Sequence, residues 1–147
     1  MTTPIAPLGE IIGFIVGTIS NDPVLQGLGH SVAWSHQAPS QTPFPYFIIQ
    51  KQSDNYRFTL DSGRAFDQHF ISVKSVTRNN IEESDGGELG RLANERAREI
   101  LFTQRPTLSN GYTMRIRESN GFEYREAEDG NRLYYHVGTV YAIMMGY

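Results

Sequence analysis

Cysteine is absent from the chain, and lysine occurs only as Lys51 and Lys74. The lack of cysteine excludes disulfides, thiolate catalysis and cysteine-ligated zinc. Long apolar runs are missing too: the longest, Ile11 to Ile19, falls far short of the ~20 residues that a membrane-spanning helix needs. Because no basic residue precedes Lys51, the sequence lacks the charged leader of a secretory signal. We therefore expect a soluble protein, made in the cytosol and without membrane contact.

The composition is that of a globular protein. The chain has 147 residues, which predicts one domain over 1–147, and 39% of them are hydrophobic against 20% charged. The 13 basic and 16 acidic residues leave a net charge of −3. This balance argues against a general nucleic-acid binder, which would carry a basic excess.

Charge is spread unevenly along the chain. Residues 1–50 carry only Glu10 and Asp22, so this segment is either core or covered by another molecule. Most of the basic residues are arginine, which is favoured over lysine at protein interfaces because its planar fork pairs bidentately. Host codon usage explains the same bias equally well.

Hydrophobic spacing predicts three helices. The first covers 8–20, where four isoleucines recur on one face. Asp22 as N-cap and Pro23 as first residue begin a short second helix, which Gly29 ends. The third helix is amphipathic and covers about 86–104. Its expected apolar stripe is Leu89, Leu92, Ala93, Ala97, Ile100 and Leu101, and its expected capping box is Asp85 with Glu88.

The remaining segments are typical of strands that alternate with turns. Asn120-Gly121 and Asp129-Gly130 are strong two-residue hairpin signals. The final strand would be roughly 45 Å long at ~3.3 Å per residue, so it must bend, at Gly138, or protrude with its hairpin. The expected strands are 31–35, 46–49, 54–60, 66–77, 112–118, 122–126 and 132–145, with a proline-rich loop over 35–45.

The order of these elements predicts the fold class. Strands come in runs with one long helix between them, rather than in β–α–β alternation. We therefore expect an α+β fold: a mostly antiparallel sheet with a C-terminal β-meander, the amphipathic helix and an N-terminal helix packed on one face.

No pattern in the sequence predicts catalysis, cofactor binding or a metal site. Gly27-Leu28-Gly29 begins like a dinucleotide-binding loop, but the third glycine and a preceding strand are missing. Acidic residues gather in turns, where solvated charge is the default. No nucleophile and base are paired in the sequence, so we expect no enzymatic activity. The histidines, none of them spaced as metal ligands, are His30, His36, His69 and His136.

Aromatic residues lie on both faces of the final expected strand. Tyr134, Tyr135 and Tyr141 occupy it together with Ile143. A strand that is apolar on both faces is either central in the fold or covered by another subunit. Both interpretations stay open at this point.

The layout as a whole resembles one known family. The residues that carry the likeness are Asp22-Pro23-Val24-Leu25, the strand entry Pro45-Tyr46-Phe47-Ile48-Ile49, the strand 70–76, the helix segment 89–97 and the closing strand 134–142. This arrangement is similar to the tail terminator family of long-tailed bacteriophages, which includes tail completion and head-to-tail joining proteins. The likeness extends over most of the chain.

The resemblance implies a structural role. Such proteins form a six-fold ring that caps the finished tail tube, stops its polymerisation and docks the tail to the head connector. The expected partners are therefore further copies of the chain, the tail tube protein and a neck or connector protein, and DNA passes through the lumen without specific binding. The expected location is the tail–neck junction of the virion, assembled in the host cytoplasm.

Subunit contacts are expected at the hairpin tips Asp61–Arg64 and Glu126–Arg132, at the acidic loop Glu82–Asp85, and at two tyrosines of the last strand. Each tip is equally well explained as a solvated turn. The individual candidates are Asp61, Arg64, Glu82, Glu83, Asp85, Glu126, Asp129, Arg132, Tyr134 and Tyr141. Two alternatives remain: another neck or head-completion subunit of the same fold, and an enzymatic or small-ligand domain.

Overall fold

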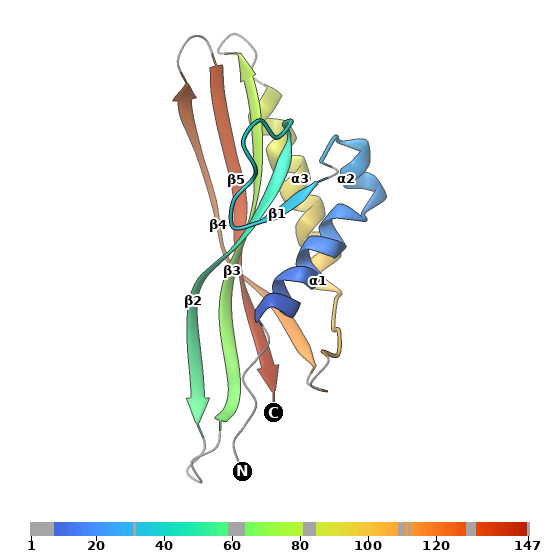
Figure 1. Cartoon of the computed structure of the whole chain (residues 1–147), viewed down its shortest axis with the longest axis vertical. Coiled ribbons are helices and arrows are strands. Elements are labelled where there is room, and N and C mark those ends of the chain that lie inside the picture. Colours follow the sequence, from blue (N-terminus) through green and yellow to red (C-terminus); the bar gives the residue numbers. More distant parts are fainter. Residues whose placement is uncertain are drawn as a thin grey trace.

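The computed structural model confirms the α+β fold (Figure 1). It has a five-stranded, mostly antiparallel sheet, and three helices lie in the part of the chain that the structure describes. The structure describes residues 8–30, 32–58, 64–80, 85–108, 111, 113–128 and 132–146. The helices are α1 (Leu8–Ser20), α2 (Pro23–Gly27) and α3 (Asp85–Phe102), and the strands are β1 (Ala33–Ser35), β2 (Tyr46–Phe58), β3 (Arg64–Asn80), β4 (Met114–Glu128) and β5 (Arg132–Gly146).

The strand order in the sheet is β1-β2-β3-β5-β4. The short β1 runs parallel to β2, and every other neighbouring pair is antiparallel. The two longest partners, β3 and β5, pair without a register shift from Phe66–Gly146 to Asn80–Arg132. The pairing of β3 with β5 therefore joins the two long hairpins, β2–β3 and β4–β5. We call this elongated pair of strands the central spine.

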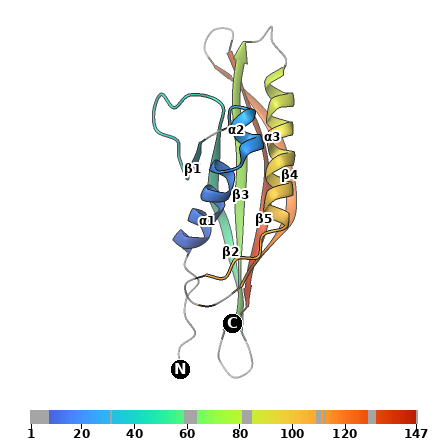
Figure 2. The same cartoon turned by 90° about the vertical axis from the view of Figure 1, so that its right-hand side faces the viewer.

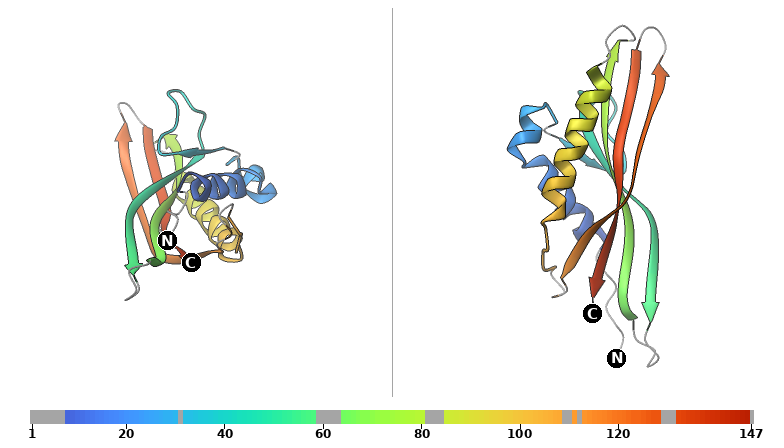
Figure 3. Two further views of the ribbon diagram at one scale, coloured as in Figure 1. Left: turned by 60° about the horizontal axis from the view of Figure 1, so that its bottom comes forward. Right: turned by 180° about the vertical axis from the view of Figure 1, so that it is seen from behind.

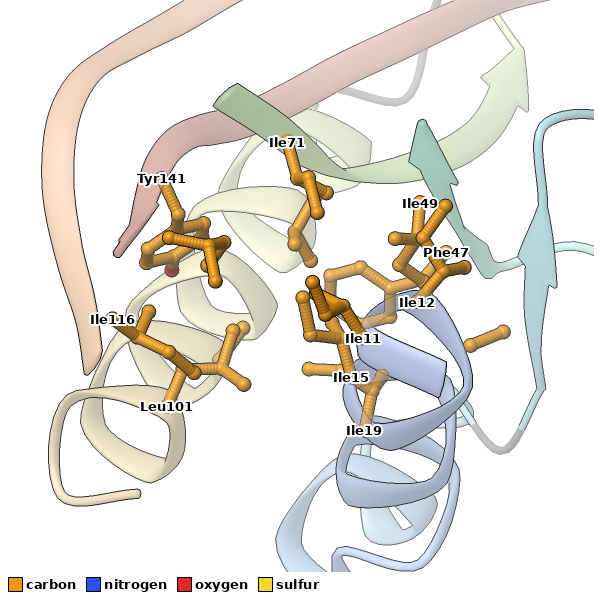
Figure 4. Close-up of a cluster of buried hydrophobic side chains, with 14 of the residues drawn as sticks. Ile11, Ile12, Ile15, Ile19, Phe47, Ile49, Ile71, Leu101, Ile116 and Tyr141 are labelled. Carbon is orange, nitrogen blue, oxygen red and sulfur yellow. The ribbon is translucent and has the colours of Figure 1, made fainter. Parts of the chain in front are cut away.

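The three helices lie together on one face of the sheet, as Figures 2 and 3 show. The isoleucine face of α1 points at this sheet face, as its spacing predicts. In Figure 4 these isoleucines meet the strand residues on one side and α3 on the other. The fully buried side chains of this core include Ile11, Ile15, Ile19, Phe47, Ile49, Ile71, Leu101 and Tyr141.

Helix α3 buries a narrower stripe than its sequence predicts. Ala93, Ala97 and Leu101 are buried, but Leu92 is 47% exposed, so its expected place in the core is wrong. Gly90 faces the sheet, and a Cβ atom added to it would lie 2.9 Å from the Val137 Cγ2 atom. Small residues here let the helix backbone approach the sheet closely. Leu92 lies about 100° around the helix from Ala93, at the edge of the predicted stripe, and so falls outside the buried face.

The predicted boundaries of α2 are confirmed. Asp22 is the N-cap and accepts a hydrogen bond from the Leu25 amide at 3.0 Å. Gly29, with φ +89°, ends the helix in a left-handed conformation that favours glycine. The Asp22 carboxylate also accepts two bonds from Arg96 of α3, at 2.8 and 2.9 Å, and this pairing lowers the pKa of Asp22. One carboxylate therefore both caps α2 and fixes it to α3.

Two expected breaks between strands are wrong. Residues 46–49 and 54–60 are not separate strands, because β2 runs continuously from Tyr46 and absorbs a bulge between Lys51 and Ser53. Asn120-Gly121 is not a hairpin turn but lies inside β4, beside a bulge between Glu118 and Asn120. In both places the long partner strand fixes the pairing, and a bulge accommodates the irregular residues without reversing the chain.

The expected length of the final strand is confirmed, and its hairpin extends past the helical layer at one end (Figure 1). At the other end, the β2–β3 hairpin reaches below α1 and α3. Gly138 lies midway along β5 and is buried against Phe122, whose ring occupies the space of the missing side chain.

Candidate assembly surfaces

Several of the predicted contact residues lie at the ends of the long β3 strand. Arg64 begins β3 opposite Phe58, at the far end of the β2–β3 hairpin. At the other end, Asn80 pairs with Arg132 of β5, close to where α3 begins at Asp85. Asp61, Glu82, Glu83 and Asp129 lie outside the described residues, as do the side chains of Arg64 and Asp85. The predicted residues that the structure describes are therefore not one continuous surface.

Glu126, Arg132 and Tyr134 are brought together near the β4–β5 end. Glu126 pairs in register with Tyr134, and Arg132 precedes Tyr134 by two residues in β5, so all three share one sheet face. Glu126 and Arg132 are exposed, and Tyr134 is half-buried. Glu126 contacts His136 and the Tyr134 ring packs against Phe44, so two of the three already have contacts within the chain.

Tyr141 occupies a different environment. Its side chain is only 1% exposed and packs in the core beneath the helices. Burial raises the pKa of its hydroxyl group. The Tyr141 ring is therefore buried by contacts within the chain and needs no second subunit to cover it.

The opposite side of the sheet, which we call the helix-free face, carries the even-numbered side chains of β3 and β5. Residues that pair in register share a face, which extends this surface onto β2 and β4. Most of its apolar side chains are half-buried, and Tyr124 is 45% exposed. The apolar and aromatic members are Tyr46, Ile48, Phe70, Val76, Phe122, Tyr124, Tyr134, Val140 and Met144.

The helix-free face is basic, although the chain as a whole is acidic. Arg115 and Arg117 flank the buried Ile116, whose side chain points to the helices, so both arginines point to the helix-free face. Among the side chains that the structure describes there, one is acidic, Glu126. The basic ones are Lys74, Arg78, Arg115, Arg117 and Arg132.

A groove of about 470 Å³ lies at one end of this face, where the proline-rich loop folds over the sheet. The Phe44 ring lies 5.3 Å from that of Tyr134, and the Arg78 guanidinium lies over both rings at 5.5 and 5.9 Å. The groove is lined by Pro39, Gln41, Thr42, Pro43, Phe44, Tyr46, Arg78 and Tyr134. The sequence gives no signal for this groove, because its two sides are distant along the chain.

A polar cluster occupies the middle of the helix-free face. The His136 ring stacks on Tyr124 at 4.4 Å, and His136 Nε2 lies 3.0 Å from Glu126 Oε1. Lys74 Nζ donates to the Tyr124 hydroxyl at 3.2 Å. Burial and the charge of Lys74 lower the pKa of His136, and Glu126 opposes them. These contacts join β3, β4 and β5 across the helix-free face.

One pair of residues has the geometry of a base and a nucleophile, which sequence reasoning missed. His30 Nε2 and Ser75 Oγ share a hydrogen bond of 2.7 Å across 45 positions of sequence. Both side chains are fully buried, and burial lowers the pKa of His30 to about 4. No carboxylate holds its Nδ1 atom. A substrate cannot reach the Ser75 hydroxyl in this conformation, so the pair acts as a packing contact.

In the described ranges, no group of three or more His, Asp or Glu side chains is placed to hold a metal ion. None of the described helices has both the length and the apolar character to cross a membrane.

Comparison with known proteins identifies the fold but no family. No family model matches the sequence, and no curated protein does. Among solved structures, the chain is similar to one in the virion of a native gene transfer agent (GTA) particle, with a TM-score of 0.68 and 14% sequence identity. The match covers 97% of this chain and 100% of that chain. The two chains therefore share a fold over their whole length.

Proposed function

We propose that this protein is a structural component of a phage-like virion and acts as a tail terminator. In this proposal it forms a ring of six subunits that caps the tail tube, ends tube polymerisation and joins the tail to the head connector. The observation that carries the proposal is the fold shared over the whole chain with a subunit from a gene transfer agent virion. The resemblance in sequence layout to tail terminators points in the same direction.

The shape of the subunit supports this role. Its spine reaches past the helical layer at both ends, which suits a protein that contacts one partner on each side (Figure 1). The partners in this proposal are the tail tube protein, a neck or connector protein and further copies of the chain, at the tail–neck junction.

The exposed surfaces support a role in assembly. The His30–Ser75 pair is buried in the core, and the described surface includes a basic, aromatic sheet face. Proteins that act by assembly need such complementary surfaces rather than a substrate cavity.

A neck or head-completion subunit of the same fold is the second candidate. Position in the genome separates the two: a terminator gene is expected beside the tube gene, and a neck gene beside the connector gene. A ring that binds connectors but not tube ends would favour the neck subunit.

The direct test is to incubate the purified protein with tail tubes and examine the ends by negative-stain electron microscopy. We expect ring-shaped caps on one end of the tubes and tubes of limited length. Tubes that continue to grow uncapped at saturating protein would contradict the proposal.

Reversing charge at both hairpin ends, with Arg64→Glu and Arg132→Glu together, should weaken ring formation and leave the fold intact. The Arg64 backbone lies at one end of the spine and the exposed Arg132 at the other, so the melting temperature should change little. Light scattering measures the assembly. The matched control is Arg105→Glu, an exposed arginine on neither hairpin, and an unchanged oligomer in the double variant would reject both hairpin ends as contacts.

A further inference from the structure

The exposed side of α3 carries a regular stripe of acidic and apolar residues. Its members recur at alternating spacings of four and three residues, so they align along one helix face. Leu92 is 47% exposed and Phe102 is 64% exposed, which makes them two of the most exposed large hydrophobic residues described. We call this set the α3 stripe: Glu88, Leu92, Glu95, Glu99 and Phe102.

The arginines beside this stripe are already engaged within the chain. Arg91 binds Glu123 of β4 through two hydrogen bonds, of 2.6 and 3.1 Å. Arg98 binds Glu118 of β4 in the same bidentate way, at 2.9 Å. Arg96 is held by Asp22 and also pairs with Glu99 of the stripe, at 3.2 Å. The charge that α3 presents outward is therefore chiefly that of Glu88 and Glu95.

The α3 stripe is therefore the chemical complement of the helix-free face. One surface is apolar with acidic residues, and the other is apolar with basic residues, chiefly Arg115 and Arg117 on the exposed edge strand. The two surfaces lie on opposite sides of the same subunit, since α3 covers the other face of the sheet (Figures 2 and 3). A single chain thus carries both halves of a contact that it cannot make with itself.

We propose that the α3 stripe of one copy docks on the helix-free face of the next copy. This inference rests on the proposed function and names the subunit surfaces through which the ring closes. Because the two surfaces differ, the contact is head-to-tail and repeats around a rotation axis until the ring closes. Leu92 and Phe102 supply the apolar centre, and the glutamates and arginines align the two copies.

A second copy explains more of the observations than a nucleic acid does. DNA would use the basic residues of the helix-free face but would leave the exposed Leu92 and Phe102 of α3 without a role. It would also meet half-buried aromatic rings that are already packed against one another. One docking event between copies covers both surfaces.

The test uses two charge-reversed variants of the full chain. Variant A, Glu88→Arg with Glu95→Arg, makes the α3 stripe basic, and variant B, Arg115→Glu with Arg117→Glu, makes the edge strand β4 of the helix-free face acidic. Neither should self-assemble, with association weakened about tenfold or more. An equimolar mixture should assemble, because each surface of A then meets its complement on B.

Light scattering across a concentration series gives the readout, and thermal melting confirms that both variants are folded. The docking would be overturned if each variant alone assembled as well as the wild type. It would also be overturned if the mixture of the two stayed dissociated. Arg105→Glu is the control for a charge reversal away from both surfaces.

Disulfide trapping tests the same contact when association is too weak for light scattering. The chain has no cysteine, so Leu92→Cys can be mixed with Gln50→Cys, Asn120→Cys or Tyr124→Cys on the helix-free face. At least one mixture should cross-link above the level of Leu92→Cys mixed with Arg105→Cys. No excess over this control in any mixture would overturn the docking.

Two outcomes separate the docking from the proposed function. Rings on tube ends without cross-links between the two surfaces would remove the docking alone, whereas the absence of rings would remove the function as well. If variant B keeps its self-association but loses binding to a short DNA duplex at low salt, the helix-free face is a nucleic-acid surface instead.

Discussion

At the scale of single residues, His30 makes the fold sensitive to acid. Its pKa is lowered to about 4 in the folded chain by burial, whereas an unfolded histidine titrates near ~6.5. Between these values the unfolded chain binds more protons, so the free energy of unfolding must fall as pH falls. The loss contributed by His30 should reach about 3 kcal/mol once pH drops below about 4.

Urea unfolding at a series of pH values checks this prediction by comparing the wild type with His30→Gln. The variant should lose most of the pH dependence between about 6.5 and 4. Ser75→Ala is the matched control: it removes the partner of His30 and should cost about 1–2 kcal/mol, yet it keeps the pH dependence because the imidazole stays buried. An equal slope in wild type and His30→Gln would refute the assignment.

Residue-level signals in the sequence are reliable where they act locally. Asp22 as a cap and Gly29 as a helix end were predictable, because each acts on backbone within a few positions of itself. The contacts of Asp22 with Arg96 and of His30 with Ser75 were not. They join residues that are far apart in sequence and come together only when α2 packs on α3 and on the sheet.

At the scale of elements, the periodicity of α1 and α3 and the long final strand predicted the fold class correctly. The errors arise where a neighbouring strand overrides a local preference. Asn120-Gly121 has the composition of a turn, but pairing with Val140 and Thr139 of β5 holds it in an extended strand. Leu92 lies at the edge of the predicted stripe of α3, and the sequence did not show that the buried face would centre on Gly90, Ala93 and Ala97 instead.

Gly138 is the element-scale position where a substitution should be most costly. A Cβ there would lie 2.6 Å from Phe122 Cζ and 2.8 Å from the Val73 carbonyl oxygen. The ring can shift, but the backbone oxygen cannot, so Gly138→Ala should lower the free energy of unfolding by about 2–3 kcal/mol in urea denaturation.

Gly121→Ala provides the control for the Gly138 prediction. It lies opposite Thr139 in the neighbouring strand, where an added Cβ meets only the Gly138 carbonyl oxygen, at 3.7 Å. Its effect should stay below about 1 kcal/mol. Comparable losses in the two variants would mean that strand propensity, rather than the close packing of Gly138, controls the stability of β5.

At the scale of the whole molecule, the α3 stripe and the helix-free face differ in charge, so the docking proposed between them should be sensitive to salt. Raising NaCl from about 0.1 M to about 1 M shortens the screening length from about 10 Å to about 3 Å. Association through the α3 stripe and the helix-free face should therefore weaken, while the melting temperature stays nearly constant. Light scattering and thermal melting on the same samples measure both, and association that strengthens with salt would indicate an apolar contact alone.

The candidate surfaces were only partly predictable, because they depend on how the strands pair across the whole molecule. Sequence identified the ends of the hairpins, because turn residues mark them. It could not assign Arg115 and Arg117 to the same surface as Lys74 and Arg78, because that requires the register between β4, β5 and β3. The net charge of the whole chain is negative, so composition alone does not reveal that one face is basic.

The unbroken ladder between β3 and β5 has a mechanical consequence. A pull along the strands, applied at opposite ends of the pair, strains every rung from Phe66–Gly146 to Asn80–Arg132 at once, whereas a sideways pull would peel the rungs apart one by one. We therefore expect the chain to resist force best along its long axis. In the proposed role, a joint under load during genome passage would be strongest if the long axis of each subunit lay parallel to the force.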